Sequence, residues 1–266
     1  MCCLSNDFFG FVAYKLLAHL EYDVSIMPSW NIHTAHVERL LSDRSPERLG
    51  ITDANAFLFG NYVPDIYVGF MVSDITYRIN YCLTHMAVPE TIPIPDADRF
   101  WDDYLSRRKP KTDAGLSLTL GAWAHLVADR FYNASFHEFY ATHDTPEGEE
   151  LRKRKQADFA LFGSSLGISS HVQATPELIE AARDFRPYSV LPADVERSIE
   201  AASAIVRAKE PLDCNHYQLL SAEWMFGVFE ACNEWLIAWL EAVLRIESRN
   251  ECASSAQVRA EAGLKS

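Results

Sequence analysis

The sequence predicts an all-α protein, a single multi-helix domain with a metal site between its core helices. Three observations carry this prediction. Apolar residues recur with the 3.6-residue period of helices, whereas the alternation typical of strands is nearly absent. Capping residues and prolines at first helical positions stand at the boundaries of these segments. Histidine and aspartate interrupt an apolar helical run, and buried polar groups there need partners.

The helices of the first half have clear start and stop signals. Asp53 and Asp96 are placed to cap two of them, and Pro64 ends one. A proline-rich loop covers Pro89–Pro95. The helices expected here are about Ile32–Ser42, Ala54–Tyr62, Ile75–Met86, Ala97–Ser106 and Asp113–Tyr140.

The second half is also helical in pattern. Pro176 and Pro192 stand at first helical positions, where proline is favoured. The basic run Arg152–Lys155 is interpreted as a solvated face, with phosphate binding as the alternative. The helices expected here are about Glu147–Leu166, one that starts at Pro176, Ala193–Lys209 and Tyr217–Arg245.

The domain is expected to span residues 27–248, followed by a disordered tail at 249–266. The status of residues 1–26 is open, because the patterned part of the chain starts at Met27 and these residues could be an extension from an upstream start codon. Residues 8–20 are apolar, but they lack a basic flank and a cleavage site and are too short to span a bilayer. No signal peptide or transmembrane segment is therefore expected.

Composition limits the function further. The chain has 266 residues, of which 48% are hydrophobic and 23% charged, as in an ordinary globular protein. The formal net charge of -13 argues against a nucleic-acid partner, for which a basic surface is expected. The 6 cysteines are irregularly spaced without a Cys-x-x-Cys pair, which predicts free thiols and a cytoplasmic location.

The most informative pair is His125 and Asp129, which are spaced i, i+4 and so share one helix face. Gly121 and Ala122 beside them leave room for a metal and for another helix. Two explanations remain open for the pair alone: metal ligands, or a core histidine bonded to the aspartate of the next turn.

Three other residues are candidates to complete a metal shell. His33 stands at a predicted helix start, and its neighbour His36 is interpreted as a solvated or capping residue. Asp65 is expected just past a helix end, on a loop fixed by Pro64. His85 is expected late in a helix. Histidine nitrogens and carboxylate oxygens together suit zinc.

These motifs, in their order and spacing, resemble the zinc-dependent phospholipase C family, within the superfamily of phospholipases C and single-strand nucleases. The similarity covers roughly residues 27–140, and the C-terminal helices carry no matching motif. The residues that carry it are the early histidine His33, the segment with Phe57, Gly60, Pro64 and Asp65, the dipeptide Thr84–His85, and Gly121, His125 and Asp129.

The resemblance implies a ligand set. One zinc would be bound by Asp65, His85, His125 and Asp129, and Asp129 would bridge to a second zinc on His33. Two such ions clamp a phosphodiester and activate a water for attack. The resemblance therefore implies a metal-dependent hydrolase of a lipid or small-molecule phosphodiester, with Asp65 as a ligand or as the catalytic base.

The sequence departs from the family at two ligands. The family's N-terminal tryptophan binds metal through its free amine, but Trp30 is internal. A third zinc is not expected, because His137 lies eight residues beyond Asp129, about 80° around the helix. His216 and Glu223, at i and i+7, are the alternative pair. The roles of His36, His137, His216 and Glu223 stay open, as does the oligomeric state.

Two alternative functions remain. The chain could be a non-catalytic helical protein of the same superfamily in which the metal only ties helices together. It could also be a zinc-dependent nuclease of the single-strand-specific type, although the net charge of -13 counts against this.

Overall fold

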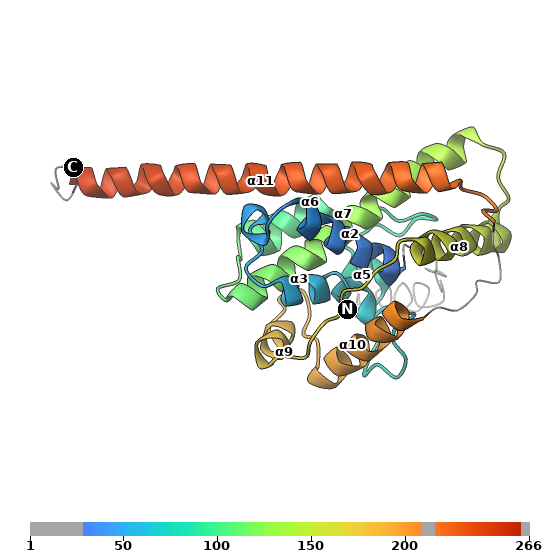
Figure 1. The fold of residues 1–266 in the computed structure, drawn as a ribbon, viewed down its shortest axis with the longest axis horizontal. Coiled ribbons are helices and arrows are strands. Elements are labelled where there is room, and N and C mark those ends of the chain that lie inside the picture. Colours follow the sequence, from blue (N-terminus) through green and yellow to red (C-terminus); the bar gives the residue numbers. More distant parts are fainter. Residues whose placement is uncertain (1–28, 209–215, 262–266) are drawn as a thin grey trace, which may run out of the picture.

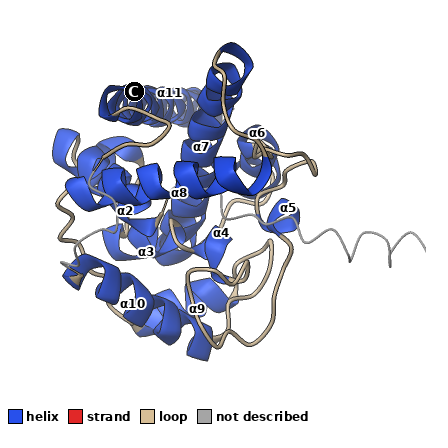
Figure 2. Ribbon diagram, turned by 90° about the vertical axis from the view of Figure 1, so that its right-hand side faces the viewer, coloured by secondary structure: helices blue, strands red, loops and turns tan. Residues whose placement is uncertain are grey.

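The structure, a computed structural model, describes residues 29–208 and 216–261, with side chains in the second range up to residue 246. Within these ranges the regular elements are all helical, which confirms the all-α prediction (Figures 1 and 2). The helices, in chain order, are α2 (Trp30–Asp43), α3 (Ala54–Gly60), α4 (Val63–Ile66), α5 (Tyr81–Thr84), α6 (Ala97–Phe100), α7 (Asp113–Thr142), α8 (Gly148–Ser165), α9 (Pro176–Arg183), α10 (Pro192–Arg207) and α11 (Ala222–Glu261), with a 3₁₀ turn η1 (Pro46–Leu49) and a π-helical turn η2 (Trp101–Ser106).

Helix α7 is the centre of the fold. It contacts α3, α9 and α11, and Figure 2 shows it in the middle of the body. Its 30 residues include a continuous buried run from Ser117 to Asp129, so the helix is covered on all sides there. A helix that is apolar all round is buried, and any polar group on it must find its partners inside the protein.

The closest helix contact joins α3 and α7 at two glycines. A Cβ atom on Gly60 would lie 2.1 Å from the carbonyl oxygen of Leu118, and a Cβ on Gly121 would lie 2.1 Å from that of Phe57. Backbone meets backbone here, so no side chain can move aside. The small residue beside His125 therefore serves the approach of another helix, as the sequence predicts.

We expect Gly121→Ala to destabilise the protein by at least about 1–3 kcal/mol, the usual cost of overpacking, because α3 would have to move away from α7. Gly227→Ala on α11 is the matched control, since nothing lies within 4 Å of its added Cβ. That change should be neutral or stabilise by up to about 1 kcal/mol through helix propensity. Urea unfolding of both variants tests this, and equal stabilities would contradict the prediction.

Two predicted boundaries near the candidate site are wrong. The helix expected over Ile75–Met86 is reduced to α5, because Asp74 has a positive φ of 55° and the side chain of Asn80 caps the later start. Pro64 does not end a helix but stands near the start of the short helix α4, where its fixed φ is tolerated. Asp65 accordingly lies within α4 rather than on a loop.

The C-terminal predictions also need correction. Helix α11 begins at Ala222, later than the expected Tyr217, and continues to Glu261, far beyond the expected Arg245. A disordered tail is predicted for 249–266; the structure assigns 249–261 to α11, and 262–266 lie outside the described residues. Figure 1 shows α11 extending past the other helices. The extension proposed for residues 1–26 also lies outside the described residues.

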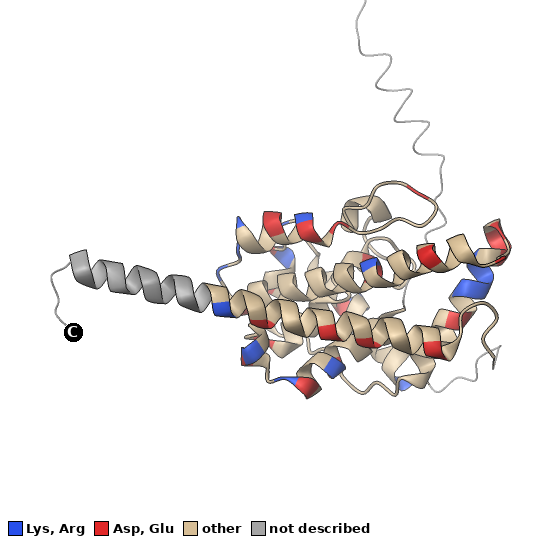
Figure 3. Cartoon of the chain, turned by 90° about the horizontal axis from the view of Figure 1, so that it is seen from above, with Lys and Arg blue, Asp and Glu red and all other residues tan. Residues whose placement is uncertain are grey.

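The described surface carries charges of both signs. Figure 3 shows acidic and basic residues interspersed over the helices rather than gathered into one basic stripe. In the part of the chain that the structure describes, no helix is both long and apolar enough to cross a membrane. Cys82 and Cys232, the cysteines with described side chains, are free thiols.

Candidate metal centre

The five candidate residues come together in the core from four segments of the chain. Helix α2 contributes His33, α4 contributes Asp65, and α7 contributes His125 and Asp129. His85 follows α5 directly as its C-cap residue. All five are buried, and Asp65 alone retains a measurable exposure, 6%.

Three of these residues form one potential ligand group. The Nε2 atom of His85 lies 3.6 Å from Oδ1 of Asp65 and 3.1 Å from Nε2 of His125. Nε2 of His125 lies 3.8 Å from the same carboxylate oxygen. These three atoms face a common point, and the group can hold a metal ion.

Asp129 connects this group with His33. Its Oδ2 lies 3.4 Å from Nε2 of His85 and 3.6 Å from Nε2 of His125. Its Oδ1 lies 3.3 Å from Nε2 of His33, whose ring stacks on that of His125 at 3.8 Å between centroids. His33, His125 and Asp129 thus form a second potential ligand group beside the first.

The two groups overlap at His125, but the bridge between them has to be Asp129. The Nδ1 atom of His125 is hydrogen-bonded to the carbonyl oxygen of Asn61 at 2.7 Å and therefore carries the proton. Only Nε2 of His125 is available as a ligand, and its single lone pair can bind only one metal ion. A carboxylate has two oxygens, and those of Asp129 point to different groups.

Neighbouring hydrogen bonds also fix the ring of His85. The hydroxyl of Thr84 donates to the carbonyl oxygen of Tyr81, so its oxygen accepts from Nδ1–H of His85 at 2.8 Å. Nε2 of His85 is then a lone pair that faces the lone pair of His125 and the oxygens of Asp65 and Asp129. Such a convergence of lone pairs requires a cation, either a proton or a metal ion.

Unpaired polar atoms point to the same need. Both ring nitrogens of His33 and Oδ1 of Asp129 are buried and make no hydrogen bond. Buried polar atoms in native proteins nearly always have a partner, so each exception requires an explanation. A metal ion between His33 and Asp129 would provide one.

The pKa values describe how protons occupy the cluster when metal is absent. Burial alone would lower the pKa of His125, but the carboxylates of Asp129 and Asp65 outweigh it and raise that pKa to about 9. Burial would raise the pKa of Asp129, yet the charge on His125 and the close contacts with three histidines keep that pKa well below the usual range. Burial lowers the pKa of His33 to about 3. In the metal-free cluster a proton on His125 therefore occupies the position of a metal cation.

Two aromatic residues orient the carboxylates. The indole N–H of Trp30 donates to Oδ2 of Asp65 at 3.1 Å, and the hydroxyl of Tyr81 donates to Oδ2 of Asp129 at 3.3 Å. Such outer hydrogen bonds hold ligands in place. Trp30 thus differs in role from the terminal tryptophan of the phospholipase family. The role of Tyr81 is not predicted above, although its spacing of one turn before His85 indicates it.

The residues whose roles were open lie outside the cluster. His36 is buried, not solvated as predicted, and its Nδ1 bonds to the side chain of Asn233 at 3.0 Å. His137 bonds to the carbonyl oxygen of Ile92 at 2.8 Å. His216 precedes the first residue of α11, so it shares no helix face with Glu223, contrary to prediction.

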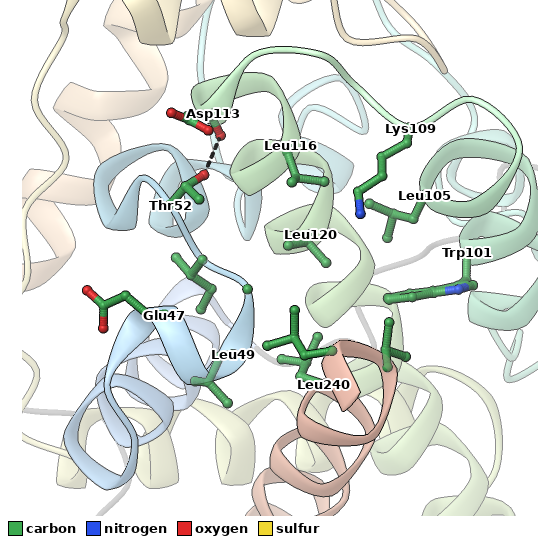
Figure 4. Close-up of a pocket in the computed structure, with 14 residues that line it drawn as sticks. Glu47, Leu49, Thr52, Trp101, Leu105, Lys109, Asp113, Leu116, Leu120 and Leu240 are labelled. Atoms are coloured by element: carbon green, nitrogen blue, oxygen red, sulfur yellow. Dashed lines mark hydrogen bonds between the residues drawn. The ribbon is translucent and has the colours of Figure 1, made fainter. Parts of the chain in front are cut away.

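An apolar pocket of about 560 Å³ lies apart from the cluster, between η1, η2, α7 and α11. Figure 4 shows Trp101, Leu105, Leu116, Leu120 and Leu240 around it. None of the five clustered residues lines it. The chemistry-bearing residues are thus in the core, and this pocket is a separate feature of the surface.

Comparisons with models of protein families, with curated proteins and with solved structures found no match. The buried histidines and aspartates of the cluster form two adjoining groups that can hold metal ions, joined by a carboxylate with one oxygen toward each.

Proposed function

We propose that this protein is a zinc-dependent hydrolase of phosphodiesters, similar to the zinc-dependent phospholipases C. The observation that carries the proposal is the division of the Asp129 carboxylate, with Oδ1 toward His33 and Oδ2 toward His85 and His125. A bridging carboxylate between two nitrogen-rich groups is the arrangement of two-metal hydrolytic sites.

The spacing of the donor atoms supports zinc. Zinc takes four ligands in a tetrahedron at about 2.0–2.1 Å, so its ligand atoms lie roughly 3.3 Å from one another. The measured separations run from 3.1 Å between the two histidine nitrogens to 3.8 Å between His125 and Asp65. Asp65, His85, His125 and Asp129 would hold one ion, and His33 with Asp129 would hold the other.

The chemistry that divalent ions supply in such a site is stabilisation of phosphoryl oxygens and a lowered pKa for a bound water. The protein contributes the orientation. Trp30 holds Oδ2 of Asp65, so Oδ1 faces the histidines. Asp65 is also the least enclosed member of the cluster, which suits a group that accepts a proton from the attacking water.

The test is metal analysis of purified protein by atomic emission, together with hydrolysis of a chromogenic phosphodiester. Wild type should contain zinc and hydrolyse the substrate, whereas His125→Ala should lose both. His137→Ala on the same helix is the matched control, since that ring bonds to a backbone carbonyl outside the cluster. Equally low zinc in wild type and His125→Ala would refute the proposal.

A structural metal site is the second candidate, favoured by the enclosure of the cluster: His33, His85, His125 and Asp129 are all 0% exposed. Structural zinc sites are closed, whereas catalytic sites keep an open position. Asp65→Asn separates the two functions. If zinc-dependent turnover disappears in Asp65→Asn while folding and zinc content are unchanged, the site is catalytic. Zinc without any turnover in wild type supports the structural role.

A nuclease is the less favoured reading of the same metal site. The net charge is -13, and Figure 3 shows acidic and basic residues interspersed rather than a basic stripe on the face in view. Proteins that bind a nucleic-acid backbone use such a stripe to neutralise phosphates. Cleavage of single-stranded DNA at a rate above that of the chromogenic phosphodiester would favour the nuclease instead.

A further inference from the structure

Lys155 is a buried lysine whose charge the fold does not neutralise. It lies on α8 and is 0% exposed, although its neighbours in the sequence suggested a solvated basic face. Among the described residues it makes no ion pair, and its one hydrogen bond is a long one of 3.5 Å to Oδ1 of Asn133. Lysine is almost never fully buried unless it is paired.

The ammonium lies close to the metal cluster. Asn133 follows Asp129 by four residues on α7, which is about one helical turn, or 5.4 Å along the axis. The Nδ2 atom of Asn133 donates to the carbonyl oxygen of Pro93 at 2.9 Å, so its Oδ1 is held toward Lys155. Burial lowers the pKa of Lys155 to about 7, and the nearby charge of Asp129 acts in the opposite direction.

The remaining contacts of Lys155 are aromatic. Its Nζ lies 4.0 Å from the ring centroid of Phe136 and 5.5 Å from that of Phe159. A desolvated cation–π contact is worth about 2 kcal/mol, whereas burial of an ammonium costs several kcal/mol. The aromatic rings therefore do not offset the cost of this charge.

A buried donor without a hydrogen bond belongs to Tyr132, whose ring contacts Phe159, as the ammonium of Lys155 does. The hydroxyl of Tyr132 is buried and makes no hydrogen bond, and its ring packs edge-on against Phe159 at 5.4 Å between centroids. Asp129 acts on its pKa as well, so Tyr132 also adjoins the cluster. An ammonium with one long hydrogen bond and a hydroxyl with none indicate a ligand with oxygen acceptors and negative charge.

We propose that Lys155, with the hydroxyl of Tyr132, forms an anion subsite beside the metal centre that binds a non-bridging phosphoryl oxygen of the substrate. This inference rests on the proposed function. It adds the ammonium of Lys155 to the two metal ions as a third positive charge that would contact the phosphate. A role in ligand binding would explain a buried lysine that lowers stability, because functional groups often reduce stability.

Binding of inorganic phosphate to the zinc-loaded protein tests the inference by titration calorimetry. Lys155→Met, which keeps the length of the side chain, should weaken phosphate binding by about 10- to 100-fold, the effect of a lost hydrogen bond to a charged group. Zinc content should not change. The metal-free variant should also unfold at a higher temperature than wild type, because an unneutralised buried charge is gone.

Lys153→Met is the matched control, since Lys153 lies on the same helix with 64% of its side chain exposed and pairs with Glu149. It should leave phosphate affinity unchanged. Unchanged phosphate affinity in Lys155→Met, or a lower unfolding temperature of that variant, would overturn the inference. Lys155 would then have a structural role only.

The outcome stays distinct from that of the proposed function. If wild type takes up no zinc, the proposed function fails, and the two metal-free proteins are compared with phosphate alone. Weaker binding by Lys155→Met then still supports the subsite, and equal binding overturns it.

Discussion

Asp129→Asn is expected to abolish binding of both metal ions and, with it, hydrolysis. The amide keeps the shape of the carboxylate but removes its charge and replaces one ligand oxygen with a donor nitrogen. Both groups of donors lose a member at once, because Oδ1 faces His33 and Oδ2 faces His85 and His125. Zinc affinity should fall by more than the roughly 10- to 100-fold that follows loss of an outer hydrogen bond.

Competition with a chromophoric chelator measures this loss. Asp158→Asn provides the control, because Asp158 is an equally buried carboxylate whose oxygens accept from the backbone amides of Gln218, Leu219 and Leu220. That variant should lose stability and keep its zinc affinity. If Asp129→Asn still binds two zinc ions with wild-type affinity, the bridge assignment is wrong.

Zinc binding is expected to depend steeply on pH, with one proton released for each protein at pH 7. His125 has a pKa of about 9 in the metal-free protein, so its Nε2 is protonated at neutral pH and must lose that proton to bind zinc. Affinity should therefore rise about tenfold for each pH unit up to about pH 9, by simple linkage. Calorimetry in buffers of different ionisation enthalpy measures the proton; no release at pH 7 would contradict the assignment.

The same histidine sets a trend in the stability of the metal-free protein. Its pKa is raised from 6.5 to about 9, so its contribution is complete below pH 6.5 and is lost as the pH rises through 9. His33 acts in the opposite sense. Its pKa is lowered to about 3, so stability is lost as the pH falls below 6.5 toward 3. Zinc binding should remove the loss at high pH, because a metal ion then replaces the proton.

Local sequence signals were sufficient where neighbours along the chain decide the structure. The cap at Asp53, the cap at Asp96 and the long helix through His125 are all found as predicted, because each depends on residues within one or two turns. The helix predicted over Ile75–Met86 is wrong, because most of this segment is irregular and only Tyr81–Thr84 is helical. The positive φ of Asp74 interrupts the chain there, and the periodicity of apolar residues does not predict such a backbone angle.

Lys155, the last residue of the basic run Arg152–Lys155, shows a different limit of prediction from sequence. A run of four basic residues predicts a solvated face, and the first three of them, Arg152 to Arg154, are at least partly accessible to solvent. Lys155 turns inward because it falls on the face of α8 that also carries Leu151, Phe159 and Phe162. The helix period places it there, and only the packing of α8 against α2 and α7 excludes water from it.

The sequence by itself determined the all-α class and the long helix through His125, because helix periodicity depends on local spacing, and its resemblance to the zinc-dependent phospholipase C family indicated the five clustered residues. The tertiary structure decided which atoms face one another: the division of the Asp129 oxygens, the single free nitrogen of His125 and the charge at Lys155. These depend on the approach of segments distant in the chain, above all the contact of Gly60 with Gly121, where two backbones meet without side chains between them.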